Sequence, residues 1–310
     1  MTRVSIVETP DYSRIKEDID QVFRLHGGLE KFVARGERVL IKPNLLGKPR
    51  RPDEPVATDP RTILALAELL LDRGARVSVG DSPAFHSAGA VLEALGVLED
   101  LRKRDVRIQE FNRPEKRLLG NALDRAVLEA DRIINLPRLK VHCQLLFTLG
   151  VKNLFGCVSG KRKPYLHMTL GDRENLFAEN LVRNCKRIAP AFTLVDGIEA
   201  MEGKGPRDGR IKRLGLLVGG PDAVAVDRII LDILGIPPEN FRVWHAARDL
   251  KIGVWERDQI EILGPRELPR RSIQLSRSLD ISFAPHRVLK STIKGLILKK
   301  LKHRRAKTSA

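Results

Sequence analysis

Segments with strand-like and helix-like hydrophobic patterns alternate along most of the chain. The strand-like segments are short and apolar, at residues 4–7, 38–41, 75–79, 106–111, 133–136, 192–195, 214–218 and 261–263. The helix-like segments carry apolar residues at helical spacing, at residues 15–29, 60–74, 91–98, 175–188, 222–234 and 238–250. Strands that alternate with helices form βαβ units, which place parallel strands in one sheet with helices packed against it. The sequence therefore predicts an α/β fold with a mostly parallel open sheet flanked by helices.

Length and hydrophobic content bound the number of domains. The 310 residues are 42% hydrophobic, which is enough to bury one large core or two smaller ones. We expect residues 1–284 to form a single α/β domain. A domain of this length could also consist of two lobes. Residues 285–310 differ in composition and are expected to form a separate basic tail.

The net charge of the chain is concentrated at its carboxyl end. Residues 286–310 hold nine Lys or Arg and no acid, so they supply +9 of the formal net charge of +17 and leave +8 for the rest. Apolar residues recur there at helical spacing, at Val288, Leu289, Ile293, Leu296, Ile297 and Leu301. This pattern predicts a basic amphipathic helix that docks on an anionic membrane surface or on RNA. The same apolar stripe would also allow the helix to pack on its own domain.

A long stretch between Asp131 and Asp172 contains no acidic residue. Pro137 ends the strand-like segment 133–136, because proline has no amide hydrogen to donate to a sheet. Cations, imidazoles and an amide follow, at Lys140, His142, Lys152, Asn153 and His167. A basic run of this kind favours an anionic group such as a carboxylate or a phosphate, if it closes around a pocket.

Some of these polar residues lie among apolar neighbours, namely Lys140, His142, Lys152 and Asn153. A charged group is costly to bury unless something pairs with it, so we expect these residues to form the centre of a binding site. Three basic residues of the same stretch are interpreted instead as parts of a solvated loop, namely Arg138, Arg162 and Lys163.

Polar residues also follow three other predicted strands. They are Lys42 and Asn44 after 38–41, Asp81 and Ser82 after 75–79, and Asp196 after 192–195. Ligands of open α/β sheets bind outside the carboxyl ends of the strands, so these residues are candidates for substrate binding. The simpler roles are a surface lysine at a turn for Lys42 and a helix cap for Asp81.

Loops supply the remaining candidates. Thr58 or Asp59 is expected to cap the helix that follows, and the amino terminus of a helix also favours an anion. The proline-rich residues 50–55 are long enough to cover a pocket as a lid. The glycine-rich run 199–209 would allow a tight backbone path that brings Glu202 and Lys204 near a ligand.

Several short motifs stand in order along the chain. They are KPNLL at 42–46, VGDSP at 79–83, K-x-H-x(9)-K-N-x-x-G at 140–156, VDGIEAMEGKGPRDG at 195–209 and D-x-V-A-V-D at 222–227. Together they resemble the domain of unknown function 362 family, which includes uncharacterised iron–sulfur centre proteins, and the resemblance covers about residues 36–235. It implies an α/β fold and a shared pocket that includes the run 199–209 and the turn at Asp59. The family has no settled reaction.

Many members of that family carry an additional ferredoxin-like domain with an iron–sulfur cluster, and this chain lacks it. The resemblance therefore implies a separate ferredoxin-like partner for electron transfer. Cys143, Cys157 and Cys185 are separated by 14 and 28 positions, which fits neither a zinc site nor a cluster-binding loop. We expect no intrinsic iron–sulfur cluster. The sequence does not decide whether histidines and a carboxylate hold a divalent metal, since no ligand spacing identifies such a site.

The cysteines and the amino terminus bear on the compartment. An odd number of cysteines argues against a disulfide framework and indicates a reducing environment. The first residues have no apolar stretch of signal-peptide type, and no run approaches the ~20 apolar residues that span a bilayer. We expect a cytoplasmic protein that is peripheral at the membrane if its tail docks there.

Two functional hypotheses follow. The first is an enzyme that acts on an anionic small molecule, with His142, Lys152 and His167 as catalytic residues. A carboxylate would orient an imidazole or hold a metal, from Asp81, Asp196 or Glu202. The alternative is a non-catalytic anion-binding protein docked on RNA or an anionic membrane, although an aromatic content of 5% gives few platforms for RNA bases. The chain has no G-x-G-x-x-G or P-loop motif to cradle a nucleotide, and it leaves the substrate, the reaction and the oligomeric state open.

Overall fold

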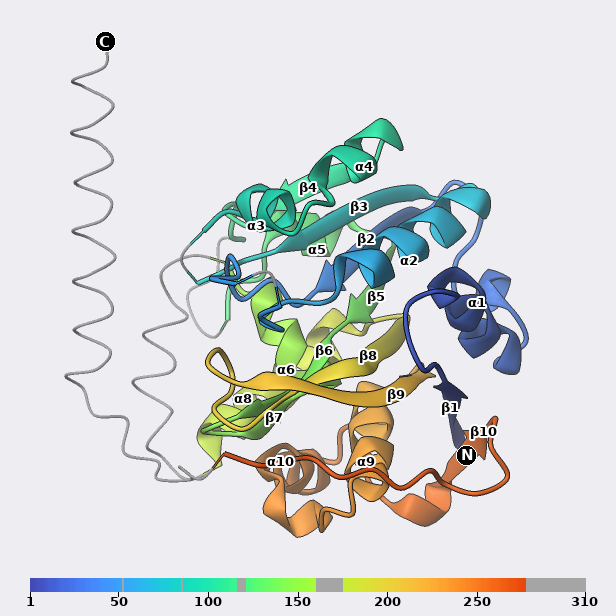
Figure 1. The fold of residues 1–310 in the computed structure, drawn as a ribbon, viewed down its shortest axis with the longest axis vertical. Coiled ribbons are helices and arrows are strands. Elements are labelled where there is room, and N and C mark those ends of the chain that lie inside the picture. Colours follow the sequence, from blue (N-terminus) through green and yellow to red (C-terminus); the bar gives the residue numbers. More distant parts are fainter. Residues whose placement is uncertain (52, 85, 116–120, 160–174, 277–310) are drawn as a thin grey trace, which may run out of the picture.

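A 10-stranded sheet forms the centre of the protein (Figure 1). The computed structural model describes residues 1–51, 53–84, 86–115, 121–159 and 175–276. The strands are β1 Thr2–Glu8, β2 Arg38–Pro43, β3 Arg76–Asp81, β4 Arg107–Glu110, β5 Arg132–Leu136, β6 Arg138–His142, β7 Leu146–Thr148, β8 Phe192–Glu202, β9 Arg210–Gly220 and β10 Ile260–Leu263. The helices are α1 Ile15–Leu25, α2 Pro60–Asp72, α3 Ala88–Ala94, α4 Leu98–Lys103, α5 Arg125–Glu129, α6 Gly150–Asn153, α8 Leu176–Ile188, α9 Ala223–Ile233 and α10 Arg242–Leu250.

The sheet is mixed but mostly parallel. Its main path runs β10-β1-β9-β8-β5-β2-β3-β4, and β6 branches from β8 and carries β7. The pairings from β8 through β5, β2 and β3 to β4 are all parallel. Strand β9 is antiparallel to both β1 and β8. The pairing with β8 follows from the short turn that joins the two strands, because a parallel pair would need a longer crossover. The predicted α/β class is confirmed, with antiparallel strands added to the parallel sheet.

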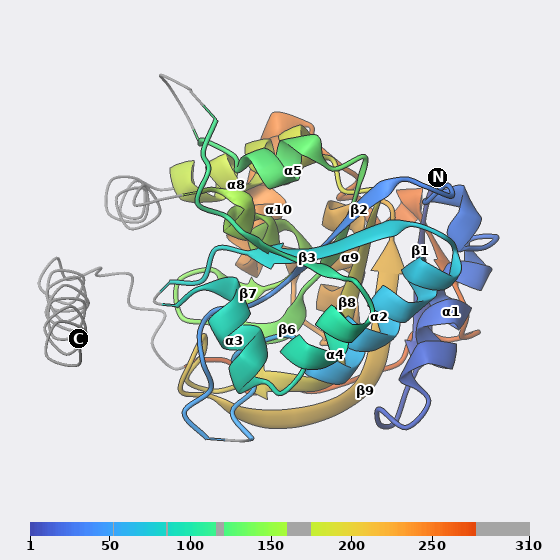
Figure 2. The ribbon, with the colours of Figure 1, turned by 90° about the horizontal axis from the view of Figure 1, so that it is seen from above.

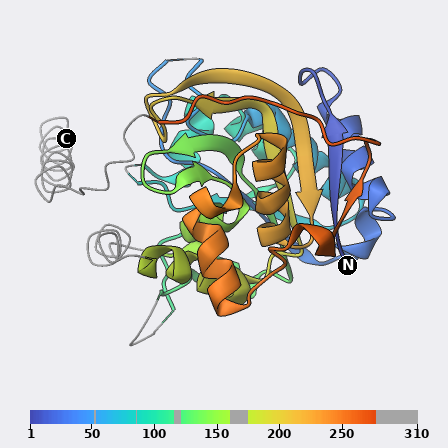
Figure 3. The same ribbon diagram turned by 90° about the horizontal axis from the view of Figure 1, so that it is seen from below.

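Helices cover both faces of the sheet (Figure 2). In β2, Leu40 belongs to one hydrophobic cluster while Val39 and Ile41 belong to another, because successive side chains of a strand point to opposite faces. The first cluster includes side chains of α5, α6, α8, α9 and α10, and the second includes those of α1, α2, α3 and α4. Figure 3 shows β8 and β9 as a long curved pair in gold beside α9 and α10 in orange. Strand β2 is thus apolar on both faces, which explains the short continuous apolar run at residues 39–41 of the sequence.

Two predicted helices are each divided in the structure. The segment 91–98 is shared between α3 and α4, because the chain turns at Gly96, whose φ of +75° favours glycine. The segment 238–250 consists of a 3₁₀ turn, Pro238–Asn240, and α10, which are separated by the extended Phe241. The predicted edge strand at 261–263 is confirmed as β10, which pairs with β1.

The main difference from the sequence-based expectation follows Pro137. Strand β5 ends at Leu136, as the proline predicted, but residues 138–148 then form β6 and β7, to which the sequence assigned no strand. Residues of β6 alternate between polar and apolar, as in a strand, but the strand is short and its polar side chains are buried together with its apolar ones. The interpretation of Arg138 as a solvated residue is wrong. Its side chain is buried and donates hydrogen bonds to the carbonyls of Ala57 and Glu199.

Some expectations concern residues outside the described part of the chain. The predicted basic tail, 285–310, lies there, and so do Arg162, Lys163 and His167. Within the described ranges, no helix is long and apolar enough to cross a membrane.

Candidate functional site

Lys42 and Asp81 form a buried ion pair at the carboxyl ends of β2 and β3. The Lys42 Nζ atom lies 3.0 Å from Asp81 Oδ1 and also donates a hydrogen bond to the carbonyl of Pro43 at 2.7 Å. The other carboxylate oxygen of Asp81 accepts from the amide of Leu45 at 2.7 Å. Both side chains are almost completely buried, so the charge of Lys42 is compensated within the protein.

Gly156 packs directly against this ion pair. A Cβ atom added at Gly156 would lie 2.2 Å from Asp81 Oδ1 and 2.5 Å from Lys42 Nζ. The glycine of the K-x-H-x(9)-K-N-x-x-G motif is therefore required by the close approach of its backbone to the pair.

Lys140 is a second buried lysine, on strand β6, which pairs with β7 and β8. Its side chain is 1% exposed, and Nζ donates hydrogen bonds to Asn44 Oδ1 at 2.5 Å and to the carbonyl of Val56 at 2.9 Å. Among the described residues, no carboxylate lies within ion-pair distance of it. Burial, together with the nearby cations of Lys152 and Arg138, lowers the pKa of Lys140 to about 7.

A directional chain of amides supports Lys140. Asn44, whose Oδ1 accepts from Lys140, donates through Nδ2 to Asn153 Oδ1 at 3.1 Å. Asn153 donates in turn to the carbonyl of Lys42 at 3.0 Å and to Asn135 Oδ1 at 2.9 Å. Both amide hydrogens of Asn153 are thus used inside the protein. Asn153 holds Asn44, and Asn44 presents its oxygen to the lysine.

The short helix α6 places Lys152 beside this network. Asp227 on α9 accepts hydrogen bonds from the first two amides of α6, those of Gly150 at 2.7 Å and Val151 at 3.1 Å. Burial outweighs these hydrogen bonds and raises the pKa of Asp227 to about 8. In the sequence, Asp227 lies within the predicted helix 222–234, where no role could be assigned to it. The partners of Asp227 are backbone amides of α6, and the sequence does not indicate such partners.

Lys152 is partly buried and has an apolar setting. Its Nζ lies 5.9 Å from the centre of the Phe177 ring, and within the described ranges it finds neither a hydrogen-bond acceptor nor a carboxylate. Burial lowers the pKa of Lys152 to about 8. Two carboxylates that follow predicted strands, Asp81 and Asp196, have other partners, namely Lys42 and the hydroxyl of Thr62.

His142 ends β6 on the same side as Lys140. Its Nδ1 atom accepts hydrogen bonds from the backbone amides of Gln144 at 3.1 Å and Leu145 at 3.4 Å. The neutral imidazole therefore carries its hydrogen on Nε2. The Oε1 atom of Gln144 is buried without a hydrogen-bond partner in the part of the chain that the structure describes.

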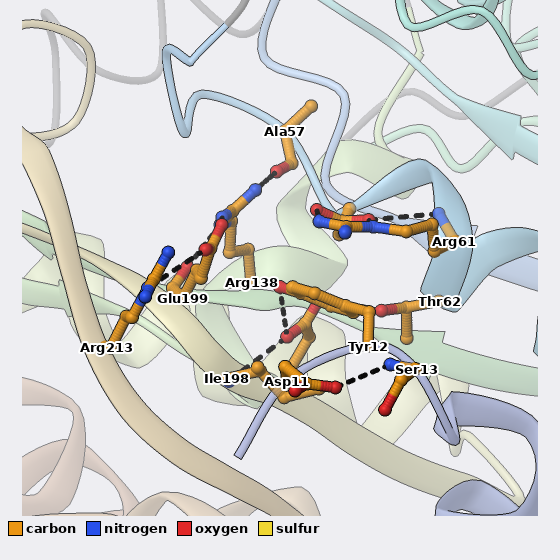
Figure 4. Close-up of polar contacts among 12 residues, drawn as sticks. Asp11, Tyr12, Ser13, Ala57, Arg61, Thr62, Arg138, Ile198, Glu199 and Arg213 are labelled. Atoms are coloured by element: carbon orange, nitrogen blue, oxygen red, sulfur yellow. Dashed lines mark hydrogen bonds and ion pairs between the residues drawn. The ribbon is translucent and has the colours of Figure 1, made fainter. Parts of the chain in front are cut away.

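Asp196 and Asp59 belong to a second polar cluster. Figure 4 shows their partners Tyr12, Thr62 and Arg61 near Arg138 of β6. Asp196 is fully buried and accepts hydrogen bonds from the hydroxyls of Tyr12 at 3.3 Å and Thr62 at 2.9 Å. Burial raises the pKa of Asp196, although the nearby Arg138 opposes the shift. Asp59 caps α2, as predicted, and also pairs with the guanidinium of Arg61 at 2.8 Å. Both acids thus have structural partners.

Glu202 and Lys204 lie at the turn between β8 and β9. Burial opposes ionisation of Glu202, but the amide of Gln274 and the guanidinium of Arg210 hold its pKa below the ordinary value. Lys204 is exposed. A Cβ atom at Gly205 would lie 1.7 Å from the carbonyl of Val141, so this turn folds back against β6.

The loop predicted as a lid contacts the same turn. Glu54 lies 3.9 Å from Arg207 Nε, and Arg207 Nη2 donates to the carbonyl of Lys48 at 2.7 Å. Arg50 pairs with Asp208 at 3.0 Å. The loop 46–55 and the turn 203–209 therefore meet through charged side chains.

The remaining candidates are placed as follows. Ser82 follows β3, and its amide donates to Asp81 at 2.7 Å. In the described ranges, no three His, Cys, Asp or Glu side chains form a group that could hold a metal ion. Cys157 and Cys185 are buried, and burial raises the pKa of Cys185. The structure therefore brings together Lys42, Asn44, Asp81, Lys140 and Asn153, with Lys152 and His142 beside them.

The sequence is similar to that of a named relative over most of its length. It is 40% identical over 283 residues to Thylakoid-associated protein sll1697 of Synechocystis sp., an alignment that covers 89% of this chain and 88% of that protein.

Two solved structures match at much lower identity. The lactate racemase apoprotein from Thermoanaerobacterium thermosaccharolyticum has a TM-score of 0.48 at 14% identity, over 72% of this chain and 55% of that one. A Thermotoga maritima protein has a TM-score of 0.45 at 16% identity, over 69% of this chain and 57% of that one. The chain thus spans little more than half the length of either.

Residues 39–232 match a family that is described as Domain of unknown function (DUF362). The match contains the ion pair of Lys42 and Asp81, and it also contains Lys140, Lys152 and Asp227. The resemblance inferred from the ordered motifs is confirmed by this match and by the relative at 40% identity. The chain belongs to the DUF362 family.

Proposed function

We propose that the protein is an enzyme that binds a small anion, a carboxylate or a phosphate, between Lys140 and Lys152. One observation carries the proposal. Of the buried lysines at the carboxyl edge of the sheet, Lys42 has Asp81 as a counter-ion, whereas Lys140 has only neutral acceptors among the described residues. A buried lysine without a counter-ion either destabilises the fold as an ammonium or gives up its proton, so a lysine kept in such a position is explained by an anion that arrives with the ligand.

The ionisable groups support an enzyme more than a passive binding protein. Lys140 and Lys152 have pKa values of about 7 and about 8, so both exchange protons near neutral pH. Perturbed pKa values of this kind gather at catalytic sites, because an acid or base works best near the pH at which it operates. We therefore favour a reaction with a proton transfer. A ferredoxin-like partner, a divalent metal and a proton transfer by His142 or His167 stay predictions.

The ligand can be sought without knowledge of the reaction. The wild-type protein and its Lys152→Met variant would each be incubated with a fractionated metabolite extract, and the bound molecules would be identified by mass spectrometry. We expect the wild type to enrich one or a few carboxylates or phosphates that the variant does not retain. Enrichment of neutral or cationic metabolites alone would contradict the proposal. Metal analysis of the same preparation tests for a bound divalent ion.

We also propose that residues 286–310 hold the protein at an anionic membrane surface. The basic amphipathic pattern of this segment supports the proposal, and so does the name of the relative, which is thylakoid-associated. Each Lys or Arg near an anionic bilayer contributes about 1 kcal/mol, so nine of them would dominate the binding.

Removal of residues 286–310 should abolish sedimentation with vesicles that contain anionic lipid. The full-length protein should bind such vesicles at low salt and should dissociate from them as added salt screens the charges. It should not bind neutral vesicles. The melting temperature of the truncated protein should stay close to that of the full chain. A large fall in melting temperature would assign the segment to the core, and retention by RNA alone would assign it to nucleic acid.

A further inference from the structure

We propose that Lys140 is the proton acceptor of the anion site, where it waits as a neutral amine and becomes an ammonium when an anionic ligand binds. The inference rests on the proposed function, since it requires an anion at this site. It assigns to Lys140 a role that the sequence motifs gave to histidines.

The hydrogen bonds of Lys140 fit a neutral amine. A neutral amine has two hydrogens and one lone pair, and Nζ meets two acceptors, Asn44 Oδ1 at 2.5 Å and the Val56 carbonyl at 2.9 Å. With both hydrogens so directed, the lone pair takes the one remaining tetrahedral direction. Asn44 is itself fixed, because its amide donates to Asn153. The base is therefore oriented before the ligand arrives.

The charges that face Lys140 also favour the neutral form. They are Lys152 on α6, Arg138 on the same strand, Asp81 at the end of β3 and Lys42 at the end of β2. Three are cations, and the one carboxylate is paired with Lys42 at 3.0 Å. Together with burial this explains a pKa of about 7, below that of Lys152.

His142 is a less suitable acceptor. Its Nδ1 lone pair already receives hydrogen bonds from the amides of Gln144 and Leu145. To accept a proton at Nδ1 it would have to break both. A lysine with two acceptors and an uncommitted lone pair needs no such rearrangement.

The resulting step is a simple proton transfer. If the ligand carries an acidic hydrogen near its anionic group, that hydrogen takes the place of the proton that Lys140 otherwise takes from solution. The bond to it breaks, and the electron pair of that bond stays on the ligand. The proton forms the third N–H bond of Lys140. Lys152, which lacks an acceptor among the described residues, offers its positive charge to the ligand anion.

Proton uptake on binding tests this assignment. Sulfate, which stands for phosphate, and acetate, which stands for carboxylate, do not titrate near pH 7.5, so any proton taken up enters the protein. Calorimetric titration in buffers with different ionisation enthalpies measures that number. For a pKa of about 7 at Lys140 and about 8 at Lys152, we expect uptake of roughly 0.8 and 0.2 proton from the two groups.

Two variants separate the contributions. Lys140→Arg keeps a charge that does not titrate, so uptake should fall to about a quarter while binding persists. Asn44→Asp has the same shape and gives Lys140 a permanent counter-ion, so uptake should fall and affinity should weaken. Circular dichroism and thermal unfolding verify that each variant folds. In the wild type, the Cε NMR signal of Lys140 should titrate near pH 7.

The possible failures are distinct. If neither sulfate nor acetate binds the wild type, the proposed function is wrong. If an anion binds but uptake is unchanged in both variants, another group takes the proton and only the role of Lys140 is wrong.

Discussion

Replacement of Asp81 by Asn should lower the free energy of unfolding by about 3–5 kcal/mol, because it leaves the ammonium of Lys42 buried without a counter-ion. The asparagine keeps the shape of the side chain, but its NH2 group cannot accept a backbone hydrogen bond as the replaced oxygen did, so the loss reports the charge together with one hydrogen bond. Lys42 is fully buried, and its other acceptor is the neutral carbonyl of Pro43. Urea denaturation of the variant and the wild type measures the difference.

An exposed ion pair of the same fold provides the control. Asp72 pairs with Lys16 at 2.9 Å, but its side chain is 67% exposed. Asp72→Asn should therefore cost less than about 1 kcal/mol. If Asp81→Asn cost no more than this, the pair of Lys42 and Asp81 would not be the structural element that leaves Lys140 as the uncompensated lysine.

Anion binding should weaken steeply as the pH rises. The binding form of each lysine is its cation, and the pKa values in the free protein are about 7 for Lys140 and about 8 for Lys152. The affinity should therefore be highest below pH 7 and should fall as the pH rises through both pKa values. Between pH 6 and pH 9 the affinity for sulfate should fall by roughly a hundredfold or more, if both cations contribute.

Calorimetry across this range measures the effect. Acetate should follow the same curve, because neither anion changes its own charge there. A single weak step would mean that one lysine binds the anion alone. A constant affinity would mean that the ligand does not depend on either lysine.

The sequence predicted those parts of the site that local rules govern. Lys42 and Asp81 follow apolar strands, and the carboxyl ends of parallel strands meet at one edge of a sheet. Asp59 and Asp222 are helix caps in the structure, as their positions before helices indicated. Spacing alone was sufficient for these residues.

Tertiary pairing could not be predicted in this way. Asp81 pairs with Lys42 and not with Lys152. Both lysines are far from Asp81 in the sequence, so only the fold determines which of them it contacts. Strand β6 was missed although its residues alternate between polar and apolar, because it is short and its polar residues were interpreted as a binding site and a solvated loop. Asp227 was left undecided because its partners are backbone amides of a helix that is distant in sequence.

The central claim is that buried lysines without counter-ions at the carboxyl edge of the sheet bind an anion, and Lys152→Met tests it most directly. Methionine keeps most of the apolar stem beside Phe177 and removes only the charge. The control is Lys103→Met, which removes an exposed lysine at the end of α4.

The measurement is the affinity for sulfate and acetate at pH 6.5, together with the free energy of unfolding. Lys152→Met should lose about tenfold or more in affinity, which corresponds to about 1.4 kcal/mol, and should unfold at equal or higher free energy than the wild type. Lys103→Met should change neither quantity. If the two variants bind both anions and resist denaturant alike, Lys152 is not part of an anion site and the account is wrong.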